Sequence, residues 1–545
     1  MSSAKGRELY KCLILCCFLL STVVLSACTR SNSVEDAEQV LVRSVVSEPD
    51  SLDPHKYRQV QADIVLRDIG EGLVGYSPNG KIVPLGASRW TVSDDALQYT
   101  FYLREAARWS NGDPVIADHY VYAFRRLFDP STASPSAGDA NAIRNSKGVI
   151  EGVNAPAEIA VRAEDSYTLV IELESPTPYF LQLLTEVSMY PLHPQSVAEH
   201  GTNFVRPGNH LSNGAYRLIG VGPKYTTLEL ERNDYYWDNE STFFDKVRWT
   251  TISDDALLSA YRAGDVDFTD HVPVQSYSIA SSQFPEQLRI SPGFTLYFYG
   301  FNLALPPLEG NVKLRQALSM AIDRETLVNK VLGRGEIPAY SLVPPGVEGY
   351  ERQLYGFSSK PQRERVEAAR QLYRQAGYSL DNPVSFELRY NTAADHERIA
   401  LAIQAMWKET LGANVELVNE EFGVIISNLQ AKDVMQVFRL GWTGDYLDAQ
   451  AFLKIFETND PNNFYNYSSA TFDALMRQAS SEPDLEKRNK LLAEAEKVSM
   501  EAYPLIPIYF LVTKHLVSPD ILGFEENSVD IHYSKNLKRA TYDNN

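Results

Sequence analysis

The chain has 545 residues, of which 51 are Lys or Arg and 70 are Asp or Glu, and its formal net charge is −19 at pH 7. A surface this acidic would repel phosphates, so the composition argues against a nucleic-acid-binding protein. The length allows two to four domains with ordinary hydrophobic cores. All four cysteines lie within the first 28 residues, so the rest of the chain has no disulfide and no cysteine-ligated zinc site.

The first 27 residues have the pattern of an export signal. Basic residues precede an apolar run over residues 12–25, which is shorter than the about 20 residues that a helix needs to cross a bilayer. The run ends in LSAC, and these small residues before Cys28 resemble a bacterial lipoprotein signal, whose cleavage leaves a lipid on the cysteine. We therefore expect a signal at 1–27, lipidation of Cys28, a polar tether at 28–37, and an exported protein anchored to a membrane, in the periplasm or at the cell surface.

The patterning changes near residue 295. Before this point the chain is rich in short predicted strands, with one helix at 116–129 that ends before Pro130. After it, predicted helices alternate with strands; the helices are 311–322, 323–333, 363–377, 394–412 and 422–431, and the strands are 385–391, 415–421 and 435–442. This alternation predicts a parallel sheet with right-handed crossovers. Ligands of such sheets bind beyond the carboxyl ends of the strands.

Candidate binding residues follow these predicted strand ends. In the stretch FRLGWTGDYLD, Arg439 lies in an apolar strand and Asp445 follows Trp442 after two residues. A carboxylate beside glycines and an aromatic face suits an ammonium group. The alternative is that Arg439 and Asp445 pair with each other or with neighbours. His396 begins a helix after another strand end, where a capping or surface role is the alternative.

Motifs for catalysis are absent from the sequence. We find no G-x-S-x-G, no H-E-x-x-H and no phosphate-binding loop. None of the nine histidines stand four residues apart on one predicted helix. We therefore expect a protein that is not an enzyme and that needs no cofactor and no metal.

Several long motifs resemble one known family. SEPDSLDPH, NGAYRL, ERNDYYWDN, LRQALSMAIDRETLVNKVL and GWTGDY occur in order across the chain after the signal. They resemble the extracytoplasmic solute-binding proteins, family 5, of peptide ABC transporters, and within that family the oligopeptide-binding proteins. The resemblance implies an α/β, periplasmic-binding-protein-like fold of type II, with two hinged α/β lobes and an extra smaller domain. The expected divisions are lobe I at 38–60, 193–294 and 512–545, the extra domain at 61–192, and lobe II at 295–511.

The same resemblance assigns roles to residues. It implies that Asp445 pairs with the α-ammonium of a bound peptide, and that Arg439 and His396 meet a carboxylate of the ligand. The remaining peptide-binding positions that it implies are Trp442 and Phe422 in side-chain pockets, Thr443 beside them, and Glu48, Tyr297, Phe298 and Tyr299 in segments that contact the peptide backbone. Two positions depart from the family pattern, because Gln430 and Leu332 stand where relatives carry cations for the peptide carboxyl end. Arg334 is the nearby candidate to replace them.

The function implied is the capture of oligopeptides between two closing lobes and their delivery to a membrane permease. The expected partners are therefore oligopeptides, permease subunits of an ABC importer and, through the lipid, a membrane; we expect a monomer. One alternative keeps the fold and changes the ligand to a murein tripeptide, a dipeptide, haem, glutathione or a nickel chelate. The other alternative is a surface lipoprotein hydrolase.

Overall fold

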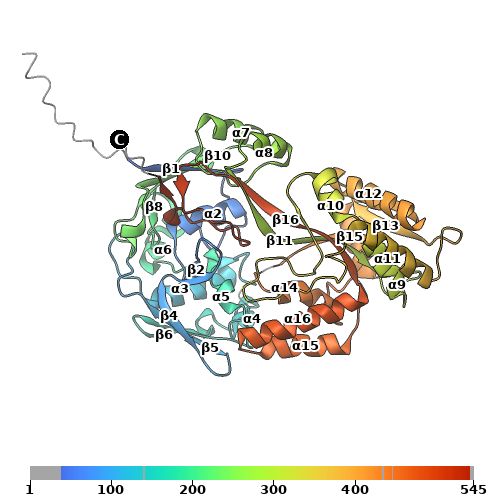
Figure 1. The fold of residues 1–545 in the computed structure, drawn as a ribbon. Helices are drawn as coiled ribbons and strands as arrows, with labels where there is room; N and C mark the ends of the chain where they lie inside the picture. The colour runs from blue at the N-terminus through green and yellow to red at the C-terminus, as the bar shows by residue number, and fades with distance from the viewer. Residues whose placement is uncertain (1–37, 139–140, 433–434, 445, 541–545) are drawn as a thin grey trace, which may run out of the picture. The chain divides into compact units, whose positions relative to one another are not determined.

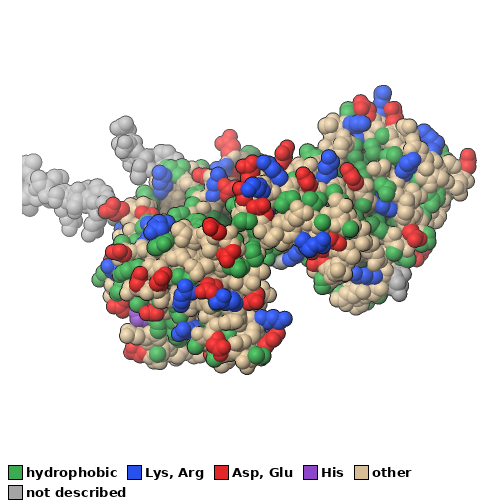
Figure 2. All heavy atoms as spheres, turned by 90° about the horizontal axis from the view of Figure 1, so that it is seen from below, with side chains coloured by type: hydrophobic (Ala, Val, Ile, Leu, Met, Phe, Trp, Pro, Cys, Tyr) green, Lys and Arg blue, Asp and Glu red, His purple; other side chains and the backbone are tan. Residues whose placement is uncertain are grey.

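The computed structural model describes residues 38–540 except 139–140, 433–434 and 445, and everything below refers to these residues. Three sheets of four or more strands organise them, each with its own hydrophobic core (Figure 1). No described helix is both long and apolar enough to cross a membrane. On the face shown in Figure 2, acidic and basic side chains are interspersed.

The first sheet has the strand order β1-β10-β9-β8, with β1 parallel to β10 and the other pairs antiparallel. Its strands are β1 (Val40–Val45), β8 (Tyr216–Val221), β9 (Thr227–Arg232) and β10 (Lys246–Thr251), and the helices of this part are α2 (Val60–Ile69), α6 (Pro194–His200), α7 (Asp254–Ala263) and α8 (Tyr277–Gln283). The buried face of α2 packs into the core of this sheet, since Val65 and Leu66 belong to the same hydrophobic cluster as Leu41. The sequence had placed α2 in the segment 61–192.

The second sheet is antiparallel, with the order β4-β5-β7-β6. Its strands are β4 (Ala87–Val92), β5 (Gln98–Leu103), β6 (Val161–Asp165) and β7 (Thr168–Glu172); a separate pair joins β2 (Val74–Tyr76) to β3 (Ile82–Pro84). The helices here are α3 (Ala117–Phe128), α4 (Ser146–Ile150) and α5 (Phe180–Leu183). The predicted helix before Pro130 is thus confirmed, and the apolar side of α3 lies in the core of this part.

The third sheet carries most of the candidate site. Its order is β12-β16-β11-β15-β13-β14. The strands are β11 (Leu288–Phe301), β12 (Ile337–Pro338), β13 (Ser385–Asn391), β14 (Asn414–Glu420), β15 (Val437–Thr443) and β16 (Leu505–Leu516), and a further pair is β17 (Ile521–Leu522) with β18 (Lys538–Arg539). The parallel pairing that the sequence predicted is confirmed for β13 with β14 and with β15. The sequence did not predict that β11 and β16 extend this sheet in antiparallel fashion.

The helices of this third part are α9 (Val312–Met320), α10 (Arg324–Thr326), α11 (Gln362–Gln375), α12 (Ala394–Leu411), α13 (Phe422–Ala431), α14 (Gln450–Leu453), α15 (Ala470–Ser481) and α16 (Leu485–Ala502). Five of them, α9 to α13, follow the predicted order, and the three after β15 were not predicted. Asp323, the first residue of the predicted helix 323–333, caps α10, since its side chain accepts a hydrogen bond from the Thr326 N–H at 2.9 Å. The predicted helix 323–333 is α10 followed by a π-helical turn over Leu327–Leu332.

The packing of α12 fixes the position of His396, one of the predicted binding residues. Buried side chains recur every four residues along this helix, at Ile399, Ile403, Trp407 and Leu411, so a single apolar face lies against the core. The Trp407 indole N–H also donates to Leu318 O at 2.8 Å, and both ends of this bond are buried. Because α12 begins just after β13 ends, its first turn lies at the carboxyl ends of the parallel strands.

Strands β11 and β16 run side by side (Figure 1) and pair from Leu288 with Leu516 at one end to Gly300 with Leu505 at the other. Residues Leu296 to Phe301 and Leu505 to Phe510 belong to the core of the third sheet. At the other end, Leu516 packs with residues of α7 and α8, and Val517 packs in the core of the first sheet. These two strands therefore connect separate cores.

Candidate functional site

Strands β15 and β11 bring together six of the predicted site residues. The strands are antiparallel, with Tyr299 opposite Arg439, Tyr297 opposite Gly441, and Thr295 opposite Thr443. Directly opposed residues project from the same face of a sheet, and successive residues project from opposite faces. Arg439, Tyr297, Tyr299 and Thr443 thus share one face, whereas Trp442 and Phe298 lie on the other.

Arg439 has a guanidinium group whose bonding capacity is only partly used. Its Nη1 donates to Asn391 Oδ1 at 2.9 Å, and the guanidinium carbon lies 4.4 Å from the centre of the Tyr297 ring. Its Nε is buried and has no hydrogen-bond partner among the described residues. The aromatic ring and the Asn391 amide hold the planar group in place, so it can present its remaining N–H groups to an anion.

His396 lies beside this arginine. Its Nδ1 is 3.3 Å from the Tyr297 hydroxyl, and the two ring centres are 5.6 Å apart. Burial, and then the positive charge of Arg439, lower the pKa of His396 from its ordinary 6.5 to about 4. The imidazole is therefore neutral at pH 7 and can exchange hydrogen bonds with a ligand without adding a second charge.

Three tyrosines pack together beside Arg439 and His396. The Tyr509 ring stacks on Tyr297 with centres 4.6 Å apart, and Tyr299 makes an edge contact with Tyr297 at 6.1 Å. Burial raises the pKa values of Tyr297, Tyr299 and Tyr509, so all three phenols stay neutral. The Tyr299 hydroxyl is buried without a hydrogen-bond partner among the described residues. The sequence analysis did not predict Tyr509 as a site residue, because only the pairing of β16 with β11 places it beside Tyr297.

Arg334 is not free to replace the two cations that relatives carry at the positions of Gln430 and Leu332. Its Nη1 lies 2.8 Å from Asp395 Oδ2 and its Nε 3.4 Å from Glu336 Oε1. Two carboxylates therefore already balance its charge. Leu332 is buried, and Gln430 lies exposed on α13. Of the cations considered for a ligand carboxylate, Arg439 is the one without a carboxylate partner among the described residues.

Residues near the end of β15 have different surroundings. The half-buried Trp442 donates its indole N–H to Ala451 O at 2.8 Å and lies 5.9 Å from the Lys454 ammonium. The hydroxyls of Thr443 and Thr295 are 2.9 Å apart across the strands. A side chain at Gly444 would collide with the Phe294 and Phe452 rings, which explains the glycine in GWTGDY by packing. Asp445, like Cys28, lies outside the described residues.

Three predicted residues, Phe298, Phe422 and Glu48, form no hydrogen bond, ion pair or ring contact with Arg439 or His396 among the described residues. Phe298 is completely buried and packs in the core of the third sheet. The backbone of β11 is paired on both sides, by β15 and β16, so the segment 297–299 offers side chains and not a free backbone edge. Phe422 begins α13 with half of its side chain exposed, and Glu48 is exposed after β1.

A contact that the sequence did not predict adjoins Asp445. The Tyr446 ring stacks on Tyr179 with centres 3.7 Å apart and planes 7° from parallel. One residue further, Leu447 O accepts a hydrogen bond from Gln182 Nε2 at 3.0 Å. The segment that follows GWTG is therefore held against the neighbourhood of α5, in the segment 61–192.

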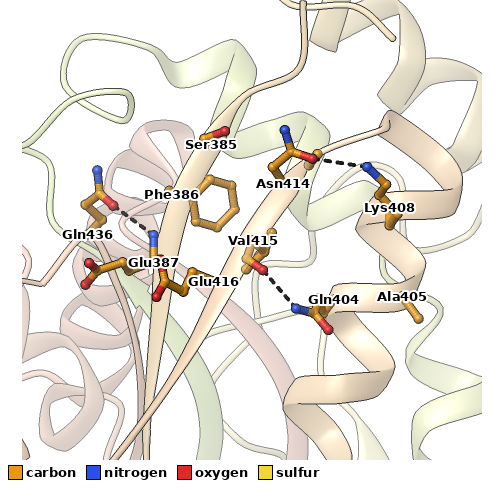
Figure 3. A pocket seen from close by; sticks show the side chains of 11 residues that line it. Ser385, Phe386, Glu387, Gln404, Ala405, Lys408, Asn414, Val415, Glu416 and Gln436 are labelled. Carbon is orange, nitrogen blue, oxygen red and sulfur yellow. Dashed lines mark hydrogen bonds between the residues drawn. The ribbon is translucent and has the colours of Figure 1, made fainter.

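The cavity drawn in Figure 3 lies at the opposite ends of the parallel strands. Ser385 and Asn414, which begin β13 and β14, line it together with α12, and its volume is about 690 Å³. Two polar side chains of its lining are paired with other groups of the same lining: Lys408 Nζ donates to Asn414 Oδ1 at 3.1 Å, and Gln404 Nε2 donates to Val415 O at 2.8 Å. Ligands of parallel sheets bind at the carboxyl ends, so we do not assign the candidate site to this cavity.

The fold and the cluster at the strand ends define a protein that binds a solute, and comparisons with known proteins specify the class. Residues 81–464 match the model of the bacterial extracellular solute-binding proteins, family 5 Middle. The chain belongs to this family, which confirms the resemblance stated from the motifs and the α/β fold class expected from it.

Individual relatives align along almost the whole chain. The periplasmic murein peptide-binding protein MppA of Escherichia coli is 35% identical over 96% of this chain and 97% of its own. The periplasmic oligopeptide-binding protein OppA of Salmonella typhimurium is 35% identical over 97% and 98%. Among solved structures, the unliganded open form of the murein tripeptide-binding protein MppA has a TM-score of 0.89 and 34% identity, covering 93% of this chain and 98% of its own.

Proposed function

We propose that this protein is the solute-binding component of an ABC importer, which captures oligopeptides between two closing lobes and delivers them to a membrane permease. The observation that carries the proposal is the cluster of Arg439, His396 and Tyr297 at the carboxyl ends of the parallel strands, in a chain of this family. An oriented cation beside a neutral imidazole and stacked phenols suits the carboxylate of an amphipathic ligand.

The two ends of the peptide would be held by different residues. Asp445 pairs with the α-ammonium, and Arg439 with a carboxylate at the far end or on an acidic side chain, with His396 beside it. Trp442, Thr443 and Phe422 contact side chains of the peptide, and Glu48 contacts it from lobe I. An ammonium buried without a partner costs several kcal/mol, so this arrangement selects peptides with a free amino end and tolerates many sequences.

The domain division that we propose follows the separate cores. Lobe I comprises 38–60, 193–294 and 512–545, the extra domain 61–192, and lobe II 295–511. Strands β11 and β16, which connect two cores, would serve as the hinge. We propose that Cys28 carries the lipid that anchors the protein to a membrane.

The specific peptide has two candidates. This chain is 35% identical to a murein peptide-binding protein and 35% identical to an oligopeptide-binding protein. A murein tripeptide is therefore the second candidate ligand, after ordinary oligopeptides. Competition between a murein tripeptide and L-tripeptides for the same protein distinguishes the two.

A calorimetric cycle tests the proposal. The protein and its Asp445→Asn variant are titrated with an L-tripeptide and with the same peptide acetylated at its amino end. We expect tight binding only for the wild-type protein with the free amine. The substitution and the acetylation together should reduce the binding free energy little more than either change alone. Equal binding of the acetylated and free peptides would contradict the assignment of Asp445, and no binding of any peptide would contradict the proposed function.

A further inference from the structure

Three potential metal ligands meet outside the proposed peptide site. They are His515, near the end of β16, and Asp530 and His532 in the segment that follows β17. The His515 Nε2 lies 2.7 Å and the His532 Nε2 3.5 Å from the same oxygen, Asp530 Oδ1. All three donor atoms lie within 4.8 Å of one another. Donors of a tetrahedral zinc site are about 3.3 Å apart, given zinc–nitrogen bonds of about 2.0 Å, so small side-chain shifts suffice.

The hydrogen bonding of His515 fixes which nitrogen faces the cluster. Its Nδ1 lies 2.9 Å from Thr269 O. A carbonyl oxygen can only accept, so Nδ1 carries the proton and donates it. Nε2 is therefore the ring nitrogen that faces the Asp530 carboxylate, 2.7 Å from Oδ1, and a metal ion bound there would take the place of a proton on Nε2. A second bond from the far nitrogen to a backbone carbonyl is also the usual support of a metal-binding histidine.

His532 is likewise buried and oriented. Its side chain is only 3% exposed, and its Nε2 has no hydrogen-bond partner among the described residues. The imidazole stacks on Phe524 with ring centres 4.3 Å apart, and the Arg43 guanidinium holds the backbone by donating to His532 O at 2.7 Å. A buried imidazole nitrogen without a partner, directed at a carboxylate oxygen, is costly unless a ligand completes the group.

The backbone around Asp530 holds its carboxylate at this place. Asp530 has a φ of +57°, in the left-handed region, and the turn is closed by the Asn527 side chain, whose Oδ1 accepts from the Ile531 N–H at 3.4 Å. Asn527 in turn donates to Pro78 O at 2.9 Å. The nearby positive charge of Arg43 is balanced by Asp68, 4.0 Å away. The Asp530 carboxylate therefore faces the two imidazoles, His515 and His532, and is not the partner of Arg43.

Space for a fourth ligand adjoins the three donors. His515, Asp530 and His532 line one side of a cavity of about 690 Å³, to which Asp270 and His271 also contribute. We propose that His515, Asp530 and His532 bind a divalent transition-metal ion of the zinc type, with the fourth coordination position open to this cavity. Two imidazoles and one carboxylate with an open position are a donor set that suits zinc. The ion would join the end of β16 to the C-terminal segment, and the inference is independent of the peptide-binding proposal.

The full-length exported chain, treated with a chelator and dialysed, provides the test. It is titrated with Zn²⁺ by calorimetry, in parallel with the variants Asp530→Asn and His532→Gln and with the control His200→Gln at the end of α6. Asparagine tolerates a positive φ as aspartate does, so Asp530→Asn removes the charge and keeps the turn. We expect one Zn²⁺ per chain for wild type and control, and about 100-fold weaker binding or more for both variants, since even outer partners of a metal site contribute 10- to 100-fold.

A second measurement places the ion. Crystals of the zinc-treated wild type should give an anomalous peak among the three donor atoms, which does not depend on whether a variant folds. Two outcomes overturn the proposal: wild type that binds no Zn²⁺, as expected if a proton shared by His515 and Asp530 takes the cation's place, or variants that bind as wild type does. Peptide affinity, measured on the same samples, reports separately on the proposed transport function.

Discussion

Replacement of Arg439 by glutamine tests the assigned carboxylate contact most closely. The guanidinium of Arg439 donates one N–H to Asn391, and its buried Nε has no hydrogen-bond partner among the described residues. The Tyr297 ring holds the guanidinium plane in place. A ligand carboxylate can thus receive charge-assisted hydrogen bonds from an oriented group. Bonds to charged groups contribute about 1.5–3 kcal/mol each. We expect Arg439→Gln to weaken the binding of a free-acid peptide by about 3 kcal/mol, or about 150-fold in Kd.

Calorimetry with a free-acid peptide and its carboxyl-terminal amide measures this effect. The amide should bind the wild-type protein about as weakly as the acid binds the variant, and the variant should treat the two alike. Arg389→Gln is the matched control, because Arg389 lies on the neighbouring β13 but is already paired with Glu387 and Glu420 at 2.7 and 2.6 Å. An equal loss for acid and amide, or a loss in the control as large as in Arg439→Gln, would refute the reasoning.

Three further predictions concern the amine contact, the pH dependence of binding and the stability of the fold. Asp445→Asn should weaken the binding of free-amine peptides by about 3 kcal/mol without changing the melting temperature, as calorimetry and thermal unfolding can check. A bound carboxylate favours protonated His396 and raises its pKa above the value of about 4 in the free protein, so the affinity for free-acid peptides should rise as the pH falls from 7 towards 5, and that for amides should not. The buried Glu496 accepts three backbone N–H groups and the Tyr350 hydroxyl. Glu496→Ala should therefore lower the free energy of unfolding in urea by about 3 kcal/mol or more, and Glu496→Gln by less; equal effects of the two would contradict this account.

The local elements of the third sheet were predictable because their signals are local. Four-residue periodicity marks α12, the cap Asp323 begins α10, and the strand-helix alternation indicates the parallel pairing of β13, β14 and β15. The order of strands depends on pairings between distant residues, which no short window contains. The insertion of β11 beside β15, and hence the position of Tyr297 next to Arg439, was therefore not predicted from patterning.

In the candidate site, too, features that depend on local sequence were predicted and features that depend on contacts between distant residues were not. His396 and Arg439 were expected at strand ends, and the structure places both within reach of the Tyr297 side chain. The pairing of Arg334 with Asp395 depends on a contact between residues 61 positions apart, so the sequence suggested a free cation where the structure has an ion pair. The histidines at 515 and 532 were judged by helical spacing, although they lie on a strand and a turn that only the fold brings together.

Native mass spectrometry of the protein purified from cells, without added ligand, tests the central claim most directly. The account predicts a ladder of bound masses that correspond to short peptides, present in the wild type and in Arg389→Gln and lost in Asp445→Asn. A single discrete bound mass with the composition of a murein peptide would assign the specialised ligand. A protein with no bound peptide, or one whose bound species persist unchanged in Asp445→Asn, would contradict the account of a peptide carrier held by this residue.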